Sequence, residues 1–117
     1  MLESGVDVIE IDRIGNAVGR HGSRFLERVY TPGEIEQSRG RTASLAARFA
    51  AKEAAFKALG ARYGWREVEV RREQGGKPRL LLHGRAAERA ASLDLRSWSV
   101  SLSHCRSCAV AVVVASE

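Results

Sequence analysis

The residues of this chain best suited to chemistry are one carboxylate and three cations spaced along an alanine-rich stretch. Glu53 and Lys57 are four positions apart, which on a helix makes opposite charges neighbours that attract. Arg48 and Lys52 are also four apart, and these two cations repel. Either Arg48 and Lys52 extend into solvent along the edge of an apolar stripe, or all four groups converge on an anionic ligand with a metal ion. The helix alone does not decide between these interpretations.

Asp7 is a second carboxylate in an unusual setting. The stretch 5–11 has β-branched residues at four of its seven positions, which predicts a strand. Asp7 would share one face of that strand with Ile9 and Ile11. A carboxylate there must be hydrogen-bonded, ion-paired or bound to a metal, because burying it bare is very costly. A structural ion pair and a ligand for a hard cation are the two alternatives.

The stretch 42–60 is predicted to form one helix, with Thr42 as its N-cap and Gly60 in the left-handed position after its last turn. A helical spacing of about 100° per residue sorts its apolar side chains into two faces. One face is bulky and the other is made of alanines: Leu45, Phe49, Phe56 and Leu59 against Ala43, Ala47, Ala50, Ala54 and Ala58. A helix with two apolar faces should be buried on both sides.

The other elements are predicted from their end signals and periodicity. Thr31 and Glu34 form a capping box with Pro32 at the first helical position, so a helix should run from there to about residue 38. Asp12 is a candidate N-cap for the preceding helix. The further expected elements are helices at 12–20, 24–30 and 84–93, and strands at 67–72, 79–83, 97–103 and 109–115. This order predicts a single α+β domain, 1–117, with an antiparallel sheet packed against the long central helix.

The composition is that of a globular protein with room for one core. The chain has 117 residues, of which 44% are hydrophobic and 28% charged. No apolar run approaches the length that spans a membrane, and the N-terminus lacks the order of a signal peptide. We therefore expect a cytoplasmic protein without membrane contact. The last strand is fully apolar, which favours an oligomer interface.

The charge balance favours an acidic partner. The formal net charge is +5, and four arginines make residues 13–28 strongly basic: Arg13, Arg20, Arg24 and Arg28. Such a run is either a solvated face or a docking surface for an acidic macromolecule. A nucleic acid, an anionic cofactor or an acidic protein would each fit the charge. The scarcity of aromatic residues argues against a protein that stacks single-stranded bases.

Three residues near the last predicted turn are open to more than one interpretation. His104 can be a hydrogen-bonding structural residue or a substrate contact, since turns at strand ends often carry function. Cys105 and Cys108 form a CxxC pair, which can be a redox motif or half of a zinc site. No second ligand pair exists in the chain, so neither use of the cysteines is favoured.

Taken together, these segments resemble the small 4′-phosphopantetheinyl transferases known as holo-acyl-carrier-protein synthases. The resemblance covers nearly the whole chain, and its most specific part is Arg48-Phe-Ala-Ala-Lys-Glu-Ala-Ala-Phe-Lys-Ala-Leu-Gly60. It also includes Gly5-Val-Asp7, the stretch 24–31, Gly76-Lys-Pro78 and Ser101-Leu-Ser-His104. It implies the 4′-phosphopantetheinyl transferase fold and transfer of phosphopantetheine from coenzyme A to a serine of an apo-acyl carrier protein, with release of adenosine 3′,5′-bisphosphate.

The resemblance also implies roles for particular residues. Asp7 and Glu53 would hold Mg²⁺, which also binds the pyrophosphate of coenzyme A. Lys57 would contact the phosphates and assist the leaving group, so the catalytic set is Asp7, Glu53 and Lys57. The coenzyme A site would further include Arg48, Lys52, Gly60 and His104. Glu53 or a metal-bound water would accept the proton of the carrier's serine.

Two further expectations follow from the resemblance. The arginines at 13, 20, 24 and 28 would dock the acidic helix of the carrier protein. The protein would assemble as a homotrimer with the coenzyme site between subunits, and would bind no nucleic acid.

The sequence departs from the family pattern at Gly60-Ala61-Arg62, where Gly-Thr-Gly is common, and at Cys105 and Cys108.

The alternatives to an Mg²⁺-dependent enzyme are a basic nucleic-acid-binding domain and a transferase-like module without catalysis.

Overall fold

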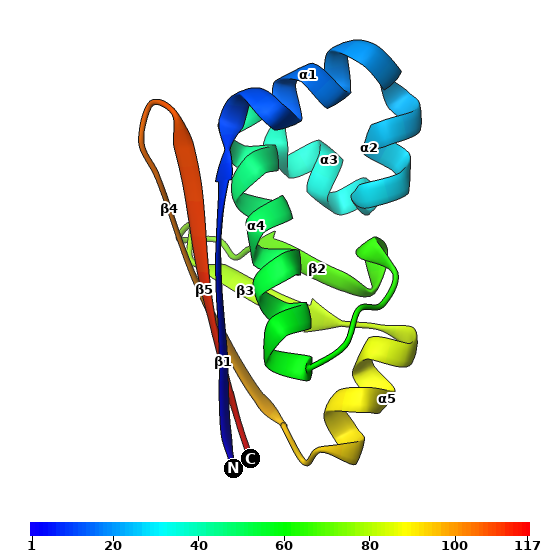
Figure 1. The fold of residues 1–117 in the computed structure, drawn as a ribbon, viewed down its shortest axis with the longest axis vertical. Coiled ribbons are helices and arrows are strands. Elements are labelled where there is room, and N and C mark those ends of the chain that lie inside the picture. The colour runs from blue at the N-terminus through cyan, green and yellow to red at the C-terminus, as the bar shows by residue number, and fades with distance from the viewer.

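The structure, a computed structural model, describes residues 1–117 as a three-stranded sheet backed by one long helix, with shorter elements beyond that helix (Figure 1). The elements in order are β1 (Leu2–Glu10), α1 (Ile11–His21), α2 (Ser23–Val29), α3 (Pro32–Ser38), α4 (Thr42–Leu59), a 3₁₀ turn (Trp65–Glu67), β2 (Val68–Arg72), β3 (Pro78–Leu82), α5 (Gly84–Ser92), β4 (Ser97–His104) and β5 (Cys108–Ser116). The predicted α+β fold with antiparallel strands and a long central helix is confirmed. No helix combines the length and apolar composition needed to cross a bilayer.

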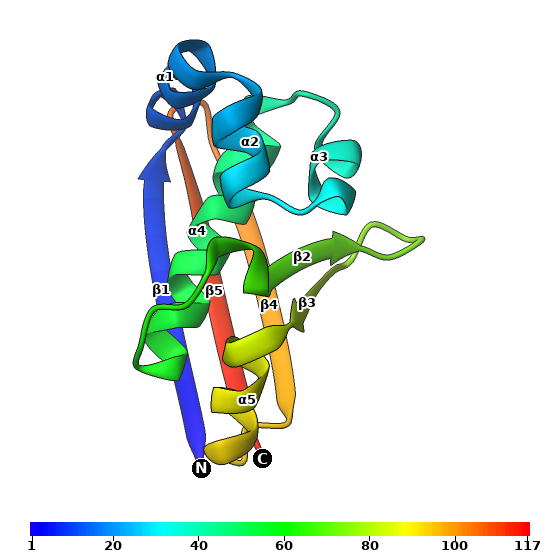
Figure 2. The ribbon, with the colours of Figure 1, turned by 90° about the vertical axis from the view of Figure 1, so that its right-hand side faces the viewer.

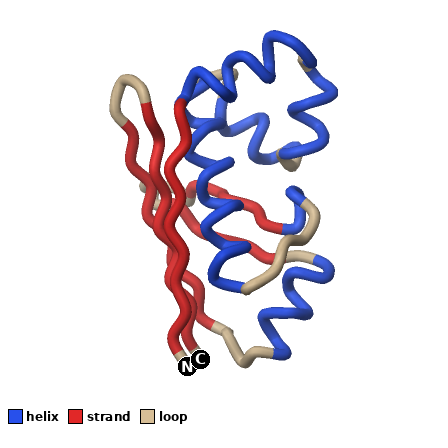
Figure 3. The backbone as a smooth tube through the Cα atoms, viewed as in Figure 1, coloured by secondary structure: helices blue, strands red, loops and turns tan.

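The main sheet has the strand order β1-β5-β4, and all its pairs are antiparallel. Its inner face packs on α4, whereas no element covers the other face (Figures 1 and 3). Strand β5 alternates accordingly: Ala111 and Val113 are buried, whereas Val112 and Val114 are exposed. The small inner side chains let the sheet approach the helix closely. Strands β2 and β3, which the sequence predicted to pair, form a separate two-stranded antiparallel sheet.

Helix α4 is buried on more than one side, as its two apolar faces predicted. Most of its residues are buried, including Leu45 and Phe56 from the bulky face and Ala50 and Ala54 from the alanine face. Gly60 ends the helix with φ of +76°, in the left-handed region that glycine adopts without strain. The predicted capping box of α3 is also confirmed, with both reciprocal hydrogen bonds between Thr31 and Glu34.

Two predicted helix starts are wrong by one or two residues. Arg41 is the N-cap of α4 and Thr42 its first helical residue, without a side-chain cap. Helix α1 begins at Ile11 with Glu10 as N-cap, so Asp12 lies inside the first turn. Ile11 therefore does not share the strand face of Asp7. Strand β1 passes into α1 without a loop, which leaves no free residue for capping.

The contact between β1 and α4 depends on Gly5. A Cβ atom at this position would lie 1.9 Å from the carbonyl oxygen of Ala54 and 3.1 Å from Cβ of Lys57. Only glycine therefore allows the strand to lie directly on the helix backbone. β1 and α4 run in opposite directions along this contact (Figures 1 and 2). Asp7, two residues beyond Gly5, consequently lies toward the N-terminal side of Ala54.

Candidate active site

Two of the predicted site residues, Asp7 and Lys57, meet where β1 lies on α4, and a third, Glu53, lies one helical turn away on α4. The ammonium of Lys57 is 3.2 Å from Oδ1 of Asp7 and donates a 2.9 Å hydrogen bond to the carbonyl oxygen of Val6. Glu53 lies one helical turn before Lys57. Because helix side chains lean toward the N-terminus, the side chain of Lys57 extends toward the turn that carries Glu53. The side chains of Asp7 and Glu53 are 22% and 18% exposed, so solvent reaches both carboxylates. This strand–helix site can thus present two carboxylates and one ammonium to a ligand.

Glu53 has a partner that the sequence did not reveal. Nη2 of Arg62 lies 3.0 Å from Oε1 and 2.9 Å from Oε2 of Glu53. Arg62 follows the helix end at Gly60, so the turn at that glycine brings the arginine back beside the last turns of α4. No periodic signal relates positions 53 and 62, which is why sequence reasoning missed the pair.

The donor set of the strand–helix site fits Mg²⁺. This ion prefers oxygen ligands and typically uses one or two carboxylates, completed by water and phosphate oxygens. Asp7 and Glu53 supply two partly exposed carboxylates from adjacent elements, and each already attracts a cation, Lys57 and Arg62 respectively. No group of three or more His, Cys, Asp or Glu side chains gathers in the chain. An ion held here would therefore take its other ligands from water and substrate.

The structure contradicts the assignment of Lys52 to the coenzyme site. Its side chain is fully buried, and its ammonium donates hydrogen bonds to Oε1 of Glu34 at 2.7 Å and to the carbonyl oxygens of Trp65 and Val68. Burial lowers the pKa of Lys52, and the charge of Glu34 acts in the opposite direction. With all three protons donated inside the protein, Lys52 has none for a ligand. Glu34, predicted only as a capping residue, is the partner that explains it.

Arg48 is likewise a structural residue in this chain. It is 1% exposed, and its guanidinium donates to the carbonyl oxygen of Val70, to the side-chain oxygen of Gln37 and to the hydroxyl of Ser44. Burial lowers the pKa of Arg48. The predicted solvent-exposed alternative for Arg48 and Lys52 is wrong too, because both side chains point into the protein. Their repulsion is relieved by Glu34 and by backbone carbonyls.

Two other predicted coenzyme contacts lie away from this cluster. Gly60 is exposed at the end of α4, one turn after Lys57. His104 is exposed at the end of β4, the edge strand opposite β1 in the main sheet. Within one chain, therefore, His104 does not join Asp7. Cys105 and Cys108 are both free thiols in the adjoining turn, and hydrogen bonds from the amides of that turn lower the pKa of Cys105.

The four predicted docking arginines share one end of the molecule. Arg13 and Arg20 lie on α1, Arg24 and Arg28 lie on α2, and all four are exposed. None of the four forms an ion pair within the chain. Two shallow hollows of about 350 and 280 Å³ lie among these side chains, with His21 lining both. We call this surface the α1–α2 basic surface.

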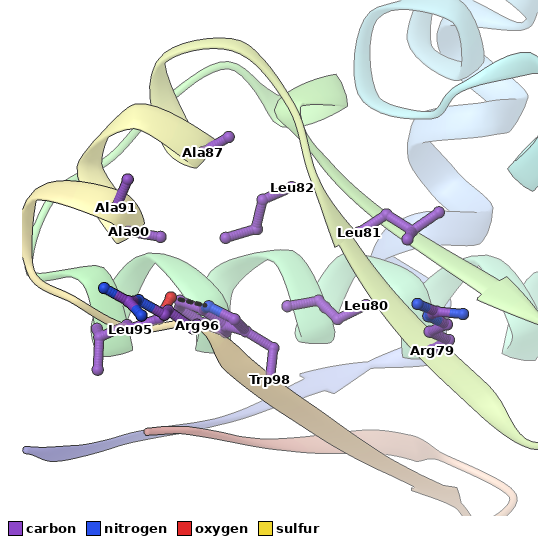
Figure 4. A pocket seen from close by; sticks show the side chains of 10 residues that line it. All are labelled: Arg79, Leu80, Leu81, Leu82, Ala87, Ala90, Ala91, Leu95, Arg96 and Trp98. Carbon is purple, nitrogen blue, oxygen red and sulfur yellow. Dashed lines mark hydrogen bonds between the residues drawn. The ribbon is translucent and has the colours of Figure 1, made fainter. Parts of the chain in front are cut away.

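The largest cavity lies elsewhere and has no catalytic character. It measures about 460 Å³ between the β2–β3 hairpin, α5 and β4. Leu80, Leu82 and Trp98 are among the apolar side chains that line it, and Arg79 and Arg96 lie at its two ends (Figure 4). The indole of Trp98 donates a 3.0 Å hydrogen bond to the carbonyl oxygen of Leu95. No carboxylate, histidine or thiol lines this cavity, so size does not identify the active site here.

Comparisons with known proteins identify relatives over almost the whole chain. Residues 3–113 match the 4′-phosphopantetheinyl transferase superfamily. The holo-[acyl-carrier-protein] synthase of Herpetosiphon aurantiacus is 52% identical over 124 residues, covering 97% of this chain and 98% of its own. That of Moorella thermoacetica is 50% identical, covering 97% and 93%. The crystal structure of the Helicobacter pylori holo-[acyl-carrier-protein] synthase in complex with coenzyme A aligns with a TM-score of 0.88 at 32% identity, covering 97% and 99%.

The chain therefore belongs to the 4′-phosphopantetheinyl transferase superfamily. The match covers far more than half of the chain, and the two relatives from Herpetosiphon and Moorella extend over almost its full length. The family predicted from the α4 signature is thus confirmed.

The buried position of Lys52 generates a stability prediction. Replacing Lys52 with Met should leave the Glu34 carboxylate buried without its partner and lower the free energy of unfolding by about 3–5 kcal/mol, or prevent folding. Urea denaturation measures this change. Lys57→Met is the matched control on the same helix, because Lys57 is 56% exposed and its loss should cost about 1 kcal/mol or less. Equal stability of the two variants would contradict the structural role of Lys52.

Proposed function

We propose that this protein transfers the 4′-phosphopantetheine group of coenzyme A to a serine of an apo-acyl carrier protein and releases adenosine 3′,5′-bisphosphate. Family membership supports the reaction class, and the crystal structure of the Helicobacter pylori relative contains coenzyme A. The observation that carries the proposal is the cluster of Asp7, Glu53 and Lys57, which has the charges that a pyrophosphate with a metal ion requires. A nucleic-acid-binding domain would leave this cluster without a purpose.

The residues of the strand–helix site have two different roles in the proposed phosphoryl transfer. Asp7 and Glu53 would hold Mg²⁺, which when bound neutralises charge on the pyrophosphate. Lys57 is 56% exposed, so its ammonium can leave Asp7 and donate to an oxygen of the departing phosphate. The attacking hydroxyl belongs to the carrier's serine, so this chain need not supply a nucleophile. In the reaction the serine oxygen forms a bond to the phosphorus atom that carries the pantetheine group. The bond from that phosphorus to the oxygen of adenosine 3′,5′-bisphosphate breaks, and the bisphosphate leaves.

The α1–α2 basic surface would dock the carrier protein. Its arginines are exposed and unpaired within the chain, so an acidic helix can reach them without displacing internal partners. Helix α1 continues directly from β1, the strand that carries Asp7. A carrier on this surface would therefore sit close to the strand–helix site. Complementary charges of this kind mainly raise the association rate and select the partner.

A homotrimer is the assembly that we propose. The uncovered face of the main sheet exposes several large apolar side chains: Val6 (54%), Val8 (63%), Val112 (41%) and Val114 (39%). Such a contiguous apolar face on a small protein indicates contact with another chain. Association would also give His104 a role, because a coenzyme site between subunits could take His104 from one chain and Asp7 from another. Within one chain these residues lie on opposite edge strands.

The central prediction concerns transfer itself. With coenzyme A, Mg²⁺ and an apo-acyl carrier protein, the wild-type protein should add one phosphopantetheine to the carrier, as seen in the carrier's mass. Glu53→Gln should lower the transfer rate at least about a hundredfold, since it removes a carboxylate that would hold the metal ion on the pyrophosphate. The urea midpoint of this variant should stay close to the wild-type value. A wild-type protein that modifies no carrier would refute the proposed reaction, and near-normal turnover by Glu53→Gln would refute the role of Glu53.

Docking is tested by reversing one charge. Arg24→Glu should raise the KM for the carrier severalfold while leaving the KM for coenzyme A unchanged, because rim charges act mainly on association. Arg85→Glu makes the same change of charge on α5, at the other end of the molecule (Figure 1), and should alter neither KM. An equal rise for carrier and coenzyme in Arg24→Glu would argue against a separate docking surface.

The proposed assembly is tested by sedimentation. Wild-type protein should sediment as a trimer, whereas Val112→Asp should sediment as a smaller species, since a carboxylate would then be buried in an apolar interface. Circular dichroism should show that this variant keeps its secondary structure, because Val112 faces outward in the single chain. Ser92→Asp, on the exposed side of α5, is the control and should remain trimeric. A trimeric Val112→Asp, or a monomeric wild type, would contradict the assignment.

A further inference from the structure

One nitrogen of Arg62 occupies the position on Glu53 where a cation would bind both oxygens. Nη2 is 3.0 Å from Oε1 and 2.9 Å from Oε2, so it lies between the two oxygens. Asp7 is neutralised in the same way by Lys57. Each carboxylate of the strand–helix site thus has its own internal cation. Without them, two neighbouring carboxylates would repel each other across the site.

The position of Arg62 is set by aromatic side chains as well as by Glu53. Its guanidinium carbon lies 5.9 Å from the ring centre of Phe56 and 5.5 Å from that of Trp65. Trp65 in turn stacks on Phe49 at 4.7 Å between ring centres. A guanidinium over an aromatic face is attracted by the ring's electrons. These contacts favour the position of Arg62 beside Glu53 in the metal-free chain.

The ion pair between Arg62 and Glu53 is weak enough for another cation to replace it. Arg62 is 65% exposed and Glu53 is 18% exposed, so water competes for both groups. An exposed ion pair contributes little free energy, far less than a buried pair such as Lys52 with Glu34. A divalent cation carries twice the charge of a guanidinium and can take both oxygens of Glu53. The pair therefore lowers the affinity of the site for a cation without blocking it.

We propose that Arg62 is an internal counter-cation that occupies Glu53 in the metal-free protein and that a divalent cation must displace. This inference rests on the proposed function, which assigns Glu53 to the metal. A bound ion would be held by Glu53 in place of Arg62 and by Asp7 in place of Lys57. Both freed cations then stand at the rim of the site, where the phosphates of the substrate arrive. Arg62 acts through Glu53 and is a positioning residue.

Binding of Mn²⁺ without coenzyme A tests the proposal directly. The paramagnetic resonance signal of free Mn²⁺ measures its dissociation constant for the intact protein. Arg62→Gln should bind Mn²⁺ about two- to fivefold more tightly than the wild type, the factor that an exposed ion pair provides. In a Glu53→Gln background the same substitution should change nothing, because the competed carboxylate is gone.

Arg66→Gln is the matched control. Arg66 is an exposed arginine of the 3₁₀ turn with no carboxylate partner, and its loss changes the net charge equally. Equal Mn²⁺ affinities of Arg62→Gln and Arg66→Gln would overturn the proposal, as would a gain that persists without Glu53. If the wild type still modifies the carrier in that case, the proposed function stands and only the role of Arg62 falls. Mn²⁺ binding that never depends on Glu53 would overturn both the metal assignment and this inference.

Discussion

The direct packing of β1 on α4 is the constraint on which the rest of the structure depends. Gly5 lets the strand lie on the helix backbone, where any Cβ would collide with the carbonyl of Ala54. Alanines on α4 and on the inner face of β5 keep the sheet equally close. This contact brings Asp7 within 3.2 Å of Lys57, although the two residues are fifty positions apart. A thicker interface would separate the two halves of the proposed site.

The four charged residues of α4 divide into two that have structural partners and two to which we assign the chemistry. Lys52 and Arg48 face α3 and β2, where Glu34, Gln37 and backbone carbonyls accept their hydrogen bonds. Burying these charges is tolerable because every buried side-chain nitrogen and oxygen in the chain has a hydrogen-bond partner. Lys57 contacts β1 and Glu53 contacts Arg62, and both side chains keep contact with solvent. The buried Lys52–Glu34 pair joins α4 to α3, and the exchange of partners that we propose concerns only the exposed pairs.

Local signals were enough to predict much of the fold, whereas several site contacts required the tertiary structure. The capping box at Thr31, the two apolar faces of α4 and the alternation of β4 are encoded in neighbouring residues, and all are observed. Asp7 was singled out because a carboxylate among apolar residues needs a partner, and Glu53 because of its spacing from Lys57. The family resemblance supplied the roles that we propose for both. Lys52 was misassigned because its partner, Glu34, lies on another helix and carried a sufficient local explanation as a cap. Arg62 was noticed only as a departure from the family pattern, because a contact made after a helix-ending turn leaves no periodic trace.

The most direct test of the account is the position of the metal in a crystal grown with coenzyme A and Mn²⁺. Anomalous scattering locates Mn²⁺ without reference to any assumed site. The account predicts one peak coordinated by carboxylate oxygens of Asp7 and Glu53 and by phosphate oxygen of the coenzyme, with the guanidinium of Arg62 turned away from Glu53. A coenzyme bound without a peak at these carboxylates, or a peak coordinated elsewhere, would contradict the central claim that the contact of β1 with α4 forms the catalytic site.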